Sequence, residues 1–214
     1  MRQRHPGRAA RRVPVRYALR HLQAVGGAAL TTQDDLATTT PRAGTARVWS
    51  LFGLVAAVVI AIDIAVKQWT TSTIAGGEPV KLLGGLIYVI YTRNSGAAFS
   101  MLSDYTWIFP IIATVVVAAL IWMVRSTAST WWTVALGLIL GGALGNLVDR
   151  IFRAPKPLHG HVVDMFSFLD DHGGHFPVFN VADSALTVGV ALAVLLEFMG
   201  RRRDGTRAKK DEHA

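Results

Sequence analysis

Four long apolar stretches interrupt a chain that is otherwise polar and basic. They cover residues 48–69, 105–124, 131–148 and 181–199. A bilayer core about 30 Å thick needs roughly 20 apolar residues of α-helix to cross it, so each stretch has about the length of one membrane span. Tryptophans near the ends of the first three stretches are typical of residues at the membrane–water interface. The pattern predicts a mainly α-helical membrane protein with four transmembrane helices.

Two longer connections between these stretches have patterns of their own. Residues 70–104 contain LIYVIYT, a run rich in β-branched and aromatic residues that follows two glycines and predicts a small β-sheet. Residues 152–180 contain prolines, glycines and histidines, which are typical of turns, together with the short amphipathic piece VVDMFSFL. We therefore expect a small sheet in the first connection and a short loop or helix in the second.

The composition agrees with a membrane protein that has basic ends. The 214 residues are 51% hydrophobic, with a mean hydropathy of +0.37 and a formal net charge of +8. The chain has no cysteine, which excludes a disulfide framework, a cysteine-bound zinc ion and a cysteine nucleophile. Any chemistry must therefore use other side chains.

The positions of lysine and arginine predict the orientation in the membrane, because positively charged segments near membrane helices tend to stay in the cytoplasm. Sixteen of the 22 lysines and arginines lie before residue 48, at Arg125 or after residue 200. Both termini are therefore expected in the cytoplasm. The connections 70–104 and 152–180 are expected on the extracytoplasmic side.

The two ends of the chain flank a four-helix membrane domain, residues 48–199. Residues 1–47 have no apolar core after their early charges, so they differ from a cleavable secretory signal, and we expect a disordered, basic cytoplasmic extension. A basic arm that contacts anionic lipid headgroups, or an unused upstream start codon, would also account for them. Residues 200–214 are expected to form a basic cytoplasmic tail.

Polar residues inside or beside membrane helices are informative, because hydrocarbon disfavours them. Asp63 and Lys67 lie four residues apart on one helix face and can form an ion pair. Four further clusters lie within RNSGAAFS, GGALGNLVDR, HVVDMF and FNVADS. Structural explanations exist for three of these four: a hairpin end in the first, close packing of small residues in the second and an N-cap in the last.

The predicted topology brings the polar residues of all five clusters to the same side of the membrane. The set comprises Asp63, Asn94, Asn146, Asp149, Arg150, Asp164 and Asp183. Two carboxyl groups that meet in partly dry surroundings cannot both ionise cheaply, so one keeps its proton while the other is charged. Such a pair can activate a water molecule and polarise a carbonyl group, which is the chemistry of amide hydrolysis.

The five clusters together resemble the bacterial lipoprotein signal peptidases, also called signal peptidase II, which are four-span aspartic peptidases. The resemblance covers residues 51–199 and rests on DIAVK, NSGAAF, GNLVDR, VVDMF and FNVADS in this order. It implies an aspartic endopeptidase of the bacterial plasma membrane that cleaves diacylglyceryl-modified prolipoproteins before the lipidated cysteine. It also implies that no metal or other cofactor is needed and that globomycin-type compounds inhibit. Residues 80–99 resemble the small extracytoplasmic β-sheet that forms a cradle for the substrate in this family. We further expect contact with membrane lipid, no nucleic-acid partner and a monomeric state.

The resemblance assigns roles to individual residues. Asp164 of VVD and Asp183 of ADS are the expected catalytic pair. Substrate-binding or supporting roles are expected for Asp63, Lys67, Asn94, Gly96, Ala98, Phe99, Gly142, Asn146, Asp149, Arg150, Asn180, Ala182 and Ser184. Asp149 adjoins Arg150 and can pair or hydrogen-bond locally, so it is expected to support the site and not to shuttle protons. Ser184 has no general base at a suitable spacing and is expected to be a hydrogen-bond partner, not a nucleophile.

Three other functions stay open at the level of sequence. A metal hydrolase could use His159, His161, His172 and His175, which flank Asp164 in the sequence and could bind zinc. An ion- or proton-coupled transporter could use the intramembrane charges, which would then line a path to both faces. A scaffold or assembly factor is the third, and it leaves the paired acids unexplained.

Overall fold

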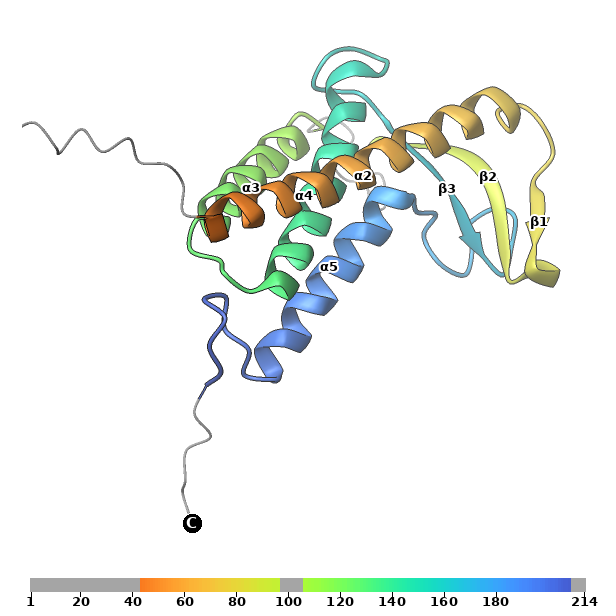
Figure 1. Ribbon diagram of the computed structural model, residues 1–214. Coiled ribbons are helices and arrows are strands. Elements are labelled where there is room, and N and C mark those ends of the chain that lie inside the picture. Colours follow the sequence, from red (N-terminus) through yellow and green to blue (C-terminus); the bar gives the residue numbers. More distant parts are fainter. Residues whose placement is uncertain (1–42, 97–105, 209–214) are drawn as a thin grey trace, which may run out of the picture. The chain divides into compact units, whose positions relative to one another are not determined.

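The computed structural model of the chain describes residues 43–96 and 106–208. Most of them form the helices α2 (Ala43–Thr73), α3 (Ile108–Val124), α4 (Thr130–Phe152) and α5 (Val181–Phe198). The strands β1 (Val80–Leu82), β2 (Ile87–Asn94) and β3 (Val162–Phe168) form one sheet, and a short 3-10 helix, η1 (Leu83–Gly85), links β1 to β2. Figure 1 shows the sheet next to the start of α5.

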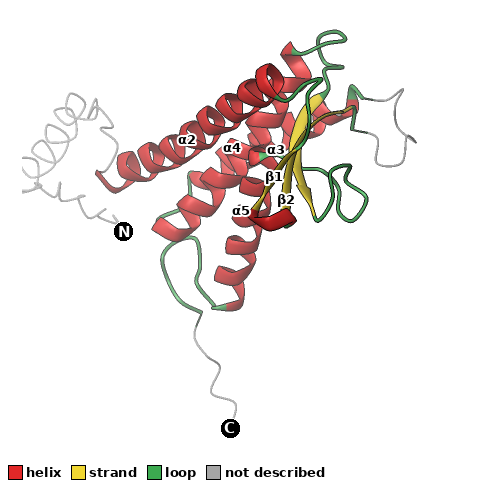
Figure 2. Ribbon diagram, turned by 90° about the vertical axis from the view of Figure 1, so that its right-hand side faces the viewer, coloured by secondary structure: helices red, strands yellow, loops and turns green. Residues whose placement is uncertain are grey.

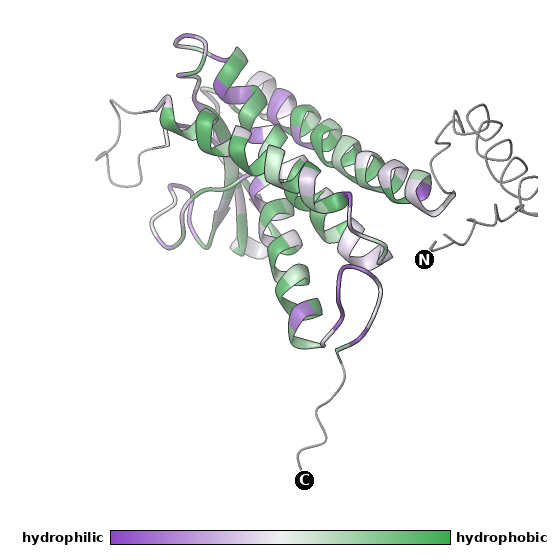
Figure 3. Cartoon of the chain, turned by 90° about the vertical axis from the view of Figure 1, so that its left-hand side faces the viewer, coloured by the Kyte–Doolittle hydropathy of each residue, from purple (hydrophilic) through white to green (hydrophobic). Residues whose placement is uncertain are grey.

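The helices have the lengths and compositions of membrane spans. Helices α2, α4 and α5 are each long and apolar enough to cross a bilayer, and α3 is a shorter apolar helix of 17 residues. That length is at the lower end of the range for a transmembrane helix. Figure 3 shows hydrophobic residues along much of the helices and many of the hydrophilic ones in the loops. The predicted mainly α-helical fold, with four apolar helices and a small sheet, is thus confirmed.

Large apolar side chains on these helices face outward. Leu54 of α2, Val115 of α3 and Val188 of α5 have exposed fractions of 62%, 63% and 57%. Water-soluble monomers rarely expose contiguous apolar surface of this kind. The outward faces are therefore suited to contact with lipid chains.

Helix α4 is central and packs against α2, α3 and α5. One buried cluster joins α2, α3 and α4 and comprises Phe52, Ala56, Leu120, Val124, Leu136 and Leu140. Glycines on α4 allow its neighbours to approach closely: a Cβ on Gly141 would lie 2.6 Å from the Cβ of Val59 in α2. A Cβ on Gly142 would lie 2.7 Å from Cγ of Leu186 in α5. Small residues therefore permit the close packing of α4 against its neighbours.

The sheet is antiparallel, with the strand order β1-β2-β3 (Figure 2). A bulge between Val89 and Thr92 interrupts the pairing of β2 with β3. Strand β3 has the sequence VVDMFSF. The sequence analysis expected a loop or a short helix in this connection, and the expectation of a helix was wrong for this segment. The strand is mostly buried on both faces, so it lacks the simple apolar–polar alternation of a half-exposed strand. Loops without further strands or helices flank it at residues 153–161 and 169–180, as expected.

Candidate active site

Asp164 lies on β3, on the opposite face of the strand from its neighbours Val163 and Met165, which belong to a buried apolar cluster. Its exposed fraction is 1%. The Asp164 Oδ2 atom accepts a hydrogen bond from Asn94 Nδ2 at 2.9 Å, and Oδ1 accepts one from Asn180 Nδ2 at 2.6 Å. A buried carboxyl group is thus held between two amide side chains.

The surroundings of Asp164 change its acidity. Burial raises the pKa of Asp164 to about 6, because the charged form loses its contact with water. The hydrogen bond from Asn94 opposes this rise in the pKa, the nearby charge of Asp183 adds to it, and the hydrogen bond from Asn180 opposes it. Asp164 therefore keeps its proton to a higher pH than an ordinary aspartate.

Asp183 lies in the first turn of α5, whose N-cap is Asn180. The two residues form a capping box: Asp183 N donates to Asn180 Oδ1 at 2.9 Å, and Asn180 N donates to Asp183 Oδ2 at 3.2 Å. The N-cap explanation is therefore correct, but it accounts for only one carboxylate oxygen. The other oxygen, Oδ1, accepts a hydrogen bond from Asn146 Nδ2 of α4 at 2.7 Å.

Asn180 joins the two aspartates. Its side-chain Nδ2 donates to Asp164 and its backbone N donates to Asp183. Asp164 and Asp183 come from different elements, a strand and a helix, yet one residue contacts both carboxyl groups. The structure thus brings the two acids singled out in the sequence to one place beside the start of α5.

Lys67 forms a buried charge cluster beneath the aspartates. Its Nζ atom lies 2.7 Å from Asp63 Oδ2 and 2.9 Å from Asp149 Oδ2, and it donates a hydrogen bond to Asn146 Oδ1 at 3.1 Å. The exposed fraction of Lys67 is 0%. The ion pair expected between Asp63 and Lys67 is present, and the same lysine also pairs with α4.

The direction of the hydrogen bonds follows from Lys67. An ammonium group only donates, so Asn146 must turn its oxygen toward Lys67 and its NH₂ group toward Asp183. Asn180 Nδ2 donates to the same Asn146 oxygen at 3.1 Å, which reinforces this orientation. Asp183 Oδ1 consequently accepts the hydrogen bond from the Asn146 NH₂ group.

Asp149 and Asp63 each have further partners besides Lys67. Asp149 pairs with Arg153 one helical turn away and accepts a hydrogen bond from Val163 N at 3.2 Å. The local pairing expected of Asp149 is therefore present, with Arg153 and not Arg150 as the ion-pair partner within α4. Asp63 Oδ1 accepts a hydrogen bond from Ala182 N at 2.9 Å, which ties α2 to the first turn of α5.

Arg150 and Gly96 lie around the end of β2. Arg150 Nη1 donates to Ser95 O at 3.2 Å, and its guanidinium carbon lies 4.7 Å from the centre of the Phe109 ring. Gly96 N donates to Asn94 Oδ1 at 2.7 Å, which orients the amide that contacts Asp164. Gly96 has a φ angle of +91°, a conformation that glycine adopts without strain.

Of the remaining predicted site residues, Ser184 and Gly142 serve local structure. Ser184 Oγ donates to Asn180 O at 2.9 Å, so it is a hydrogen-bond partner, as expected. Gly142 faces the backbone of Ala182 in α5. Ala98 and Phe99, both predicted site residues, lie outside the described residues.

An open cleft of about 490 Å³ lies beside Asp183. Its lining residues are Asn94, Phe168, Phe176, Pro177, Val178, Phe179, Asp183, Ser184, Thr187 and Val188. Asp183 borders the cleft directly, while Asp164 is buried behind and contacts Asn94, which also lines it. Sequence reasoning did not single out the aromatic wall, although FPVF just before Asn180 and the alternating phenylalanines of MFSF were a visible signal.

The histidines do not form the cluster that a metal hydrolase would need. His175 Nδ1 lies 2.5 Å from Asp170 Oδ2, and His172 Nδ1 lies 2.9 Å from Asp171 Oδ1. Hydrogen bonds from His175 and from loop backbone amides hold the pKa of Asp170 well below its usual range. Within residues 43–96 and 106–208, no group of three or more histidine, aspartate or glutamate side chains is placed so that it could hold a metal ion.

Apolar helices with two aspartates joined through Asn180, next to an open cleft, are consistent with a membrane-embedded enzyme. Comparison with known families agrees: residues 55–199 match the family model described as signal peptidase (SPase) II. The chain belongs to the signal peptidase II family. The resemblance identified in the sequence is thereby confirmed.

Named relatives and solved structures support this family membership. The lipoprotein signal peptidase of Mycobacterium avium is 46% identical over 182 residues, which cover 84% of this chain and 97% of the relative. That of Rhodococcus jostii is 46% identical and covers 73% of this chain and 77% of the relative. A solved bacterial membrane enzyme aligns with a TM-score of 0.59 at 31% identity, over 75% of this chain and 93% of the solved one.

Proposed function

We propose that the chain removes signal peptides from prolipoproteins by cleaving the amide bond before a diacylglyceryl-modified cysteine, with Asp164 and Asp183 as the catalytic pair. The assignment of Asp164 and Asp183 as the catalytic pair rests on one observation. Asn180 contacts both carboxyl groups at the start of an apolar helix, beside an open cleft. The family membership supports the choice of a peptidase reaction.

In this proposal the two aspartates divide the proton transfers. Asp183, whose oxygens both accept hydrogen bonds, takes a proton from a water molecule as the water oxygen attacks the carbonyl carbon. Asp164, whose pKa is raised to about 6, gives its proton to the carbonyl oxygen, and a tetrahedral diol forms. Asp183 then protonates the amide nitrogen, the C–N bond breaks, and Asp164 recovers its proton from the diol.

The depth of the site suits a lipid-anchored substrate. A substrate held by its diacylglyceryl group presents the bond to be cut at about headgroup depth, so the catalytic groups must be fixed there. Asp183 lies in the first turn of α5, where the apolar helix begins, and Asp164 of β3 is joined to it through Asn180. This explains why an acid and two amides are tolerated at the edge of hydrocarbon.

Supporting roles follow from the contacts. Lys67, Asp63 and Asp149 fix Asn146, which orients Asp183, and we assign these residues to positioning. Asn94 and Asn180 position Asp164. A supporting or substrate-binding role is proposed for Gly96, Ala98, Phe99, Gly142, Arg150, Ala182 and Ser184.

The cleft beside Asp183 is a suitable binding place for the substrate. Its walls carry Phe168, Phe176 and Phe179, whose rings pack together at centroid distances of 5.1–6.0 Å. An apolar wall of this kind favours apolar side chains of the signal peptide next to the cleavage point. Asp183 at its edge would then lie beside the reacting amide.

The proposal includes an orientation and a domain division. The protein spans the plasma membrane with both termini in the cytoplasm and the aspartates on the extracytoplasmic side, supported by the lysine and arginine positions. Residues 48–199 form the peptidase domain, 1–47 a cytoplasmic extension and 200–214 a cytoplasmic tail. The enzyme acts as a monomer in contact with membrane lipid, needs no metal or cofactor, and is inhibited by globomycin-type compounds.

A cleavage assay tests the proposal. The purified full-length chain is incubated with a diacylglyceryl-modified precursor and, as a matched control, with the same precursor lacking the lipid. The modified precursor should shift on a gel to the size of the mature lipoprotein, and the unmodified one should stay uncut. Globomycin should block the shift and a metal chelator should leave it unchanged.

Other outcomes would contradict specific parts of the proposal. Cleavage of both precursors at equal rates would show that the lipid does not define the substrate. Loss of cleavage in chelator, restored by zinc, would favour the metal hydrolase instead. A transporter would leave both precursors uncut while moving ions across a reconstituted membrane.

A further inference from the structure

The chain after α5 folds back onto the opposite end of the helices from the aspartates. Arg201 and Arg207 form an antiparallel bridge, which makes a tight hairpin. Trp132 Nε1 of α4 donates to Arg201 O at 2.6 Å, and the backbone N atoms of Ala128 and Ser129 donate to Arg203 O at 2.8 and 3.0 Å. The hairpin is therefore anchored by its backbone to the loop that joins α3 and α4.

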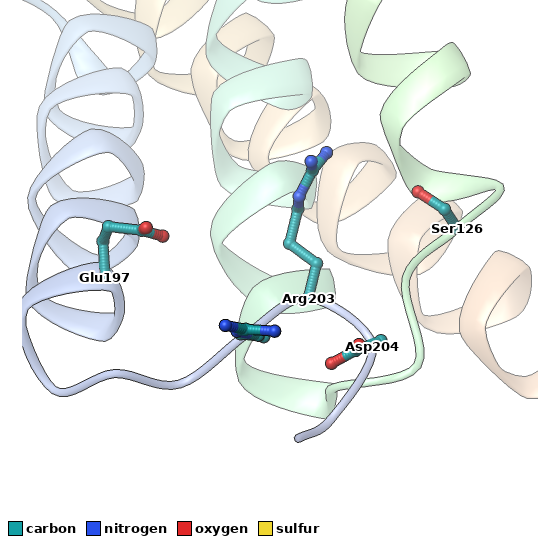
Figure 4. A pocket seen from close by; sticks show the side chains of 5 residues that line it. Ser126, Glu197, Arg203 and Asp204 are labelled. Carbon is teal, nitrogen blue, oxygen red and sulfur yellow. The ribbon is translucent and has the colours of Figure 1, made fainter. Parts of the chain in front are cut away.

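A second pocket of about 380 Å³ lies at this hairpin. Its lining residues are Ser126, Glu197, Arg202, Arg203 and Asp204. They come from the end of α5, the hairpin and the loop after α3, and Figure 4 shows the Arg203 side chain between those of Glu197 and Ser126. The volume lies within the range of about 300–1,000 Å³ that is usual for small-molecule sites.

The pocket contains both signs of charge without pairing them. Within residues 43–96 and 106–208, neither Arg202 nor Arg203 has a carboxylate oxygen within 4.0 Å. Asp204 Oδ1 instead accepts hydrogen bonds from Thr206 N at 2.9 Å and Thr206 Oγ1 at 2.7 Å. Two guanidinium groups and two carboxylates thus surround one space, an arrangement that a ligand with both charges would complement.

The aromatic residues around the pocket indicate a place near the lipid headgroups of a membrane. Helix α3 ends, α4 begins and α5 ends at this side of the bundle (Figure 1). Trp122, Trp131 and Phe198, near those three helix ends, have exposed fractions of 70%, 56% and 86%. Exposed aromatic side chains at the ends of apolar helices are typical of the membrane–water interface.

We propose that this pocket binds the headgroup of a zwitterionic aminophospholipid, that is, a phosphodiester linked to a primary ammonium group. Arg202 and Arg203 bind the phosphate oxygens, because guanidinium groups match them in charge and geometry. Glu197 and Asp204 accept hydrogen bonds from the ammonium group. The acyl chains extend along the exposed apolar surface near Phe198.

The two acids separate this proposal from general attraction of basic residues to anionic lipid. General attraction would favour phosphatidylglycerol over phosphatidylethanolamine, and removing an acid would strengthen binding. A zwitterionic site favours phosphatidylethanolamine, and removing an acid weakens the binding of this lipid. Phosphatidylcholine tests the ammonium contacts, because its quaternary nitrogen has no N–H donor.

Native mass spectrometry of the purified full-length chain, with each of the three lipids added at equal concentration, tests the proposal. Phosphatidylethanolamine should bind about tenfold more tightly than the other two. Glu197→Gln should weaken phosphatidylethanolamine binding about tenfold and strengthen phosphatidylglycerol binding. Arg203→Gln and Arg202→Gln should weaken the binding of both phosphatidylethanolamine and phosphatidylglycerol. The backbone contacts of these two residues stay unchanged in the variants. Arg207→Gln, on the same hairpin but outside the pocket lining, is the matched control and should have no such effect.

Three results would overturn the proposal. Equal binding of phosphatidylethanolamine and phosphatidylcholine would exclude the ammonium contacts. Tighter phosphatidylethanolamine binding in Glu197→Gln would identify plain charge attraction. Displacement of the lipid by an equal concentration of soluble phosphoethanolamine would assign the pocket to a free small molecule and not to a lipid.

Discussion

Hydrogen bonds to the two aspartates determine what each residue can do. Asp164 is buried between Asn94 and Asn180, while Asp183 borders the cleft and accepts hydrogen bonds from Asn146 and Asn180. Burial favours the neutral form of Asp164, while the hydrogen bonds that Asn94 and Asn180 donate to it favour its charged form. The balance makes Asp164 the acid of the pair in our proposal.

The pH dependence of catalysis follows from the acidity of Asp164. Because its pKa is raised to about 6, the protonated form is lost as the pH rises through that value, and kcat/KM should fall on the alkaline side of about pH 6. Asn94→Ala removes a hydrogen bond that lowers this pKa, so the fall should move to higher pH. Thr187→Ala, a cleft residue that bonds only the Asp183 backbone, is the control and should not move it. An unshifted profile in Asn94→Ala would argue against Asp164 as the acid.

Lys67 should contribute mainly to stability. Lys67→Met leaves Asp63 and Asp149 buried without their shared cation, which costs about 3–5 kcal/mol of unfolding free energy. Thermal unfolding of the purified variant should occur at a clearly lower temperature, while the exposed control Lys156→Met should unfold like the wild type. A Lys67→Met variant of full stability that cannot cleave would show a direct part in catalysis.

At the residue scale, sequence reasoning captured what short-range spacing determines. Asp63 and Lys67 pair because residues four apart share a helix face, and Asn180 and Asp183 cap α5 because of their residue types and spacing. The contacts of Lys67 with Asn146 and Asp149 depend on how α2 packs against α4, which no local pattern specifies. The phenylalanines of the cleft were visible in FPVF and MFSF, but their meeting in one wall depends on how the loop before α5 packs against β3.

At the scale of elements, long apolar runs were predicted well and the sheet only in part. The helices follow from length and composition, since hydrocarbon requires about 20 apolar residues. Strand β3 was missed because its pattern is short and buried on both faces, and such a run is hard to distinguish from a helix. Its pairing with β2 places Asp164 opposite Thr92, so the missed strand is also what positions one of the acids.

The packing of α4 against α5 positions Asn146 relative to Asp183, and Gly142 makes it possible. Gly142→Ala would place a methyl group against the Ala182 backbone and the Leu186 side chain, which should destabilise the protein by about 1–3 kcal/mol and lower the unfolding temperature. Gly53→Ala on α2 is the matched control, because a Cβ there meets nothing within 4 Å, and it should be neutral or stabilising. Equal unfolding temperatures for the two variants would contradict this account of the interface.

At the scale of the whole molecule, the proposed orientation places the aspartates and the aminophospholipid pocket in opposite leaflets. A fluorescent reporter that matures only in the cytoplasm should therefore be active when fused after Ala214. The same reporter fused to a chain truncated after Gly77, between α2 and β1, should be dark. Alkaline phosphatase, which is active only outside the cytoplasm, should give the reverse pattern. A dark reporter after Ala214 would invert the topology.

The central claim is that Asp164 and Asp183 together hydrolyse the amide bond, and substitution by the isosteric amide tests it most directly. Asp164→Asn and Asp183→Asn should each lower cleavage of the diacylglyceryl-modified precursor by at least about 10³-fold, because neither amide can exchange the required proton. Both variants must first be shown to insert and to unfold near the wild-type temperature. Cleavage by either folded variant at close to the wild-type rate would contradict the account.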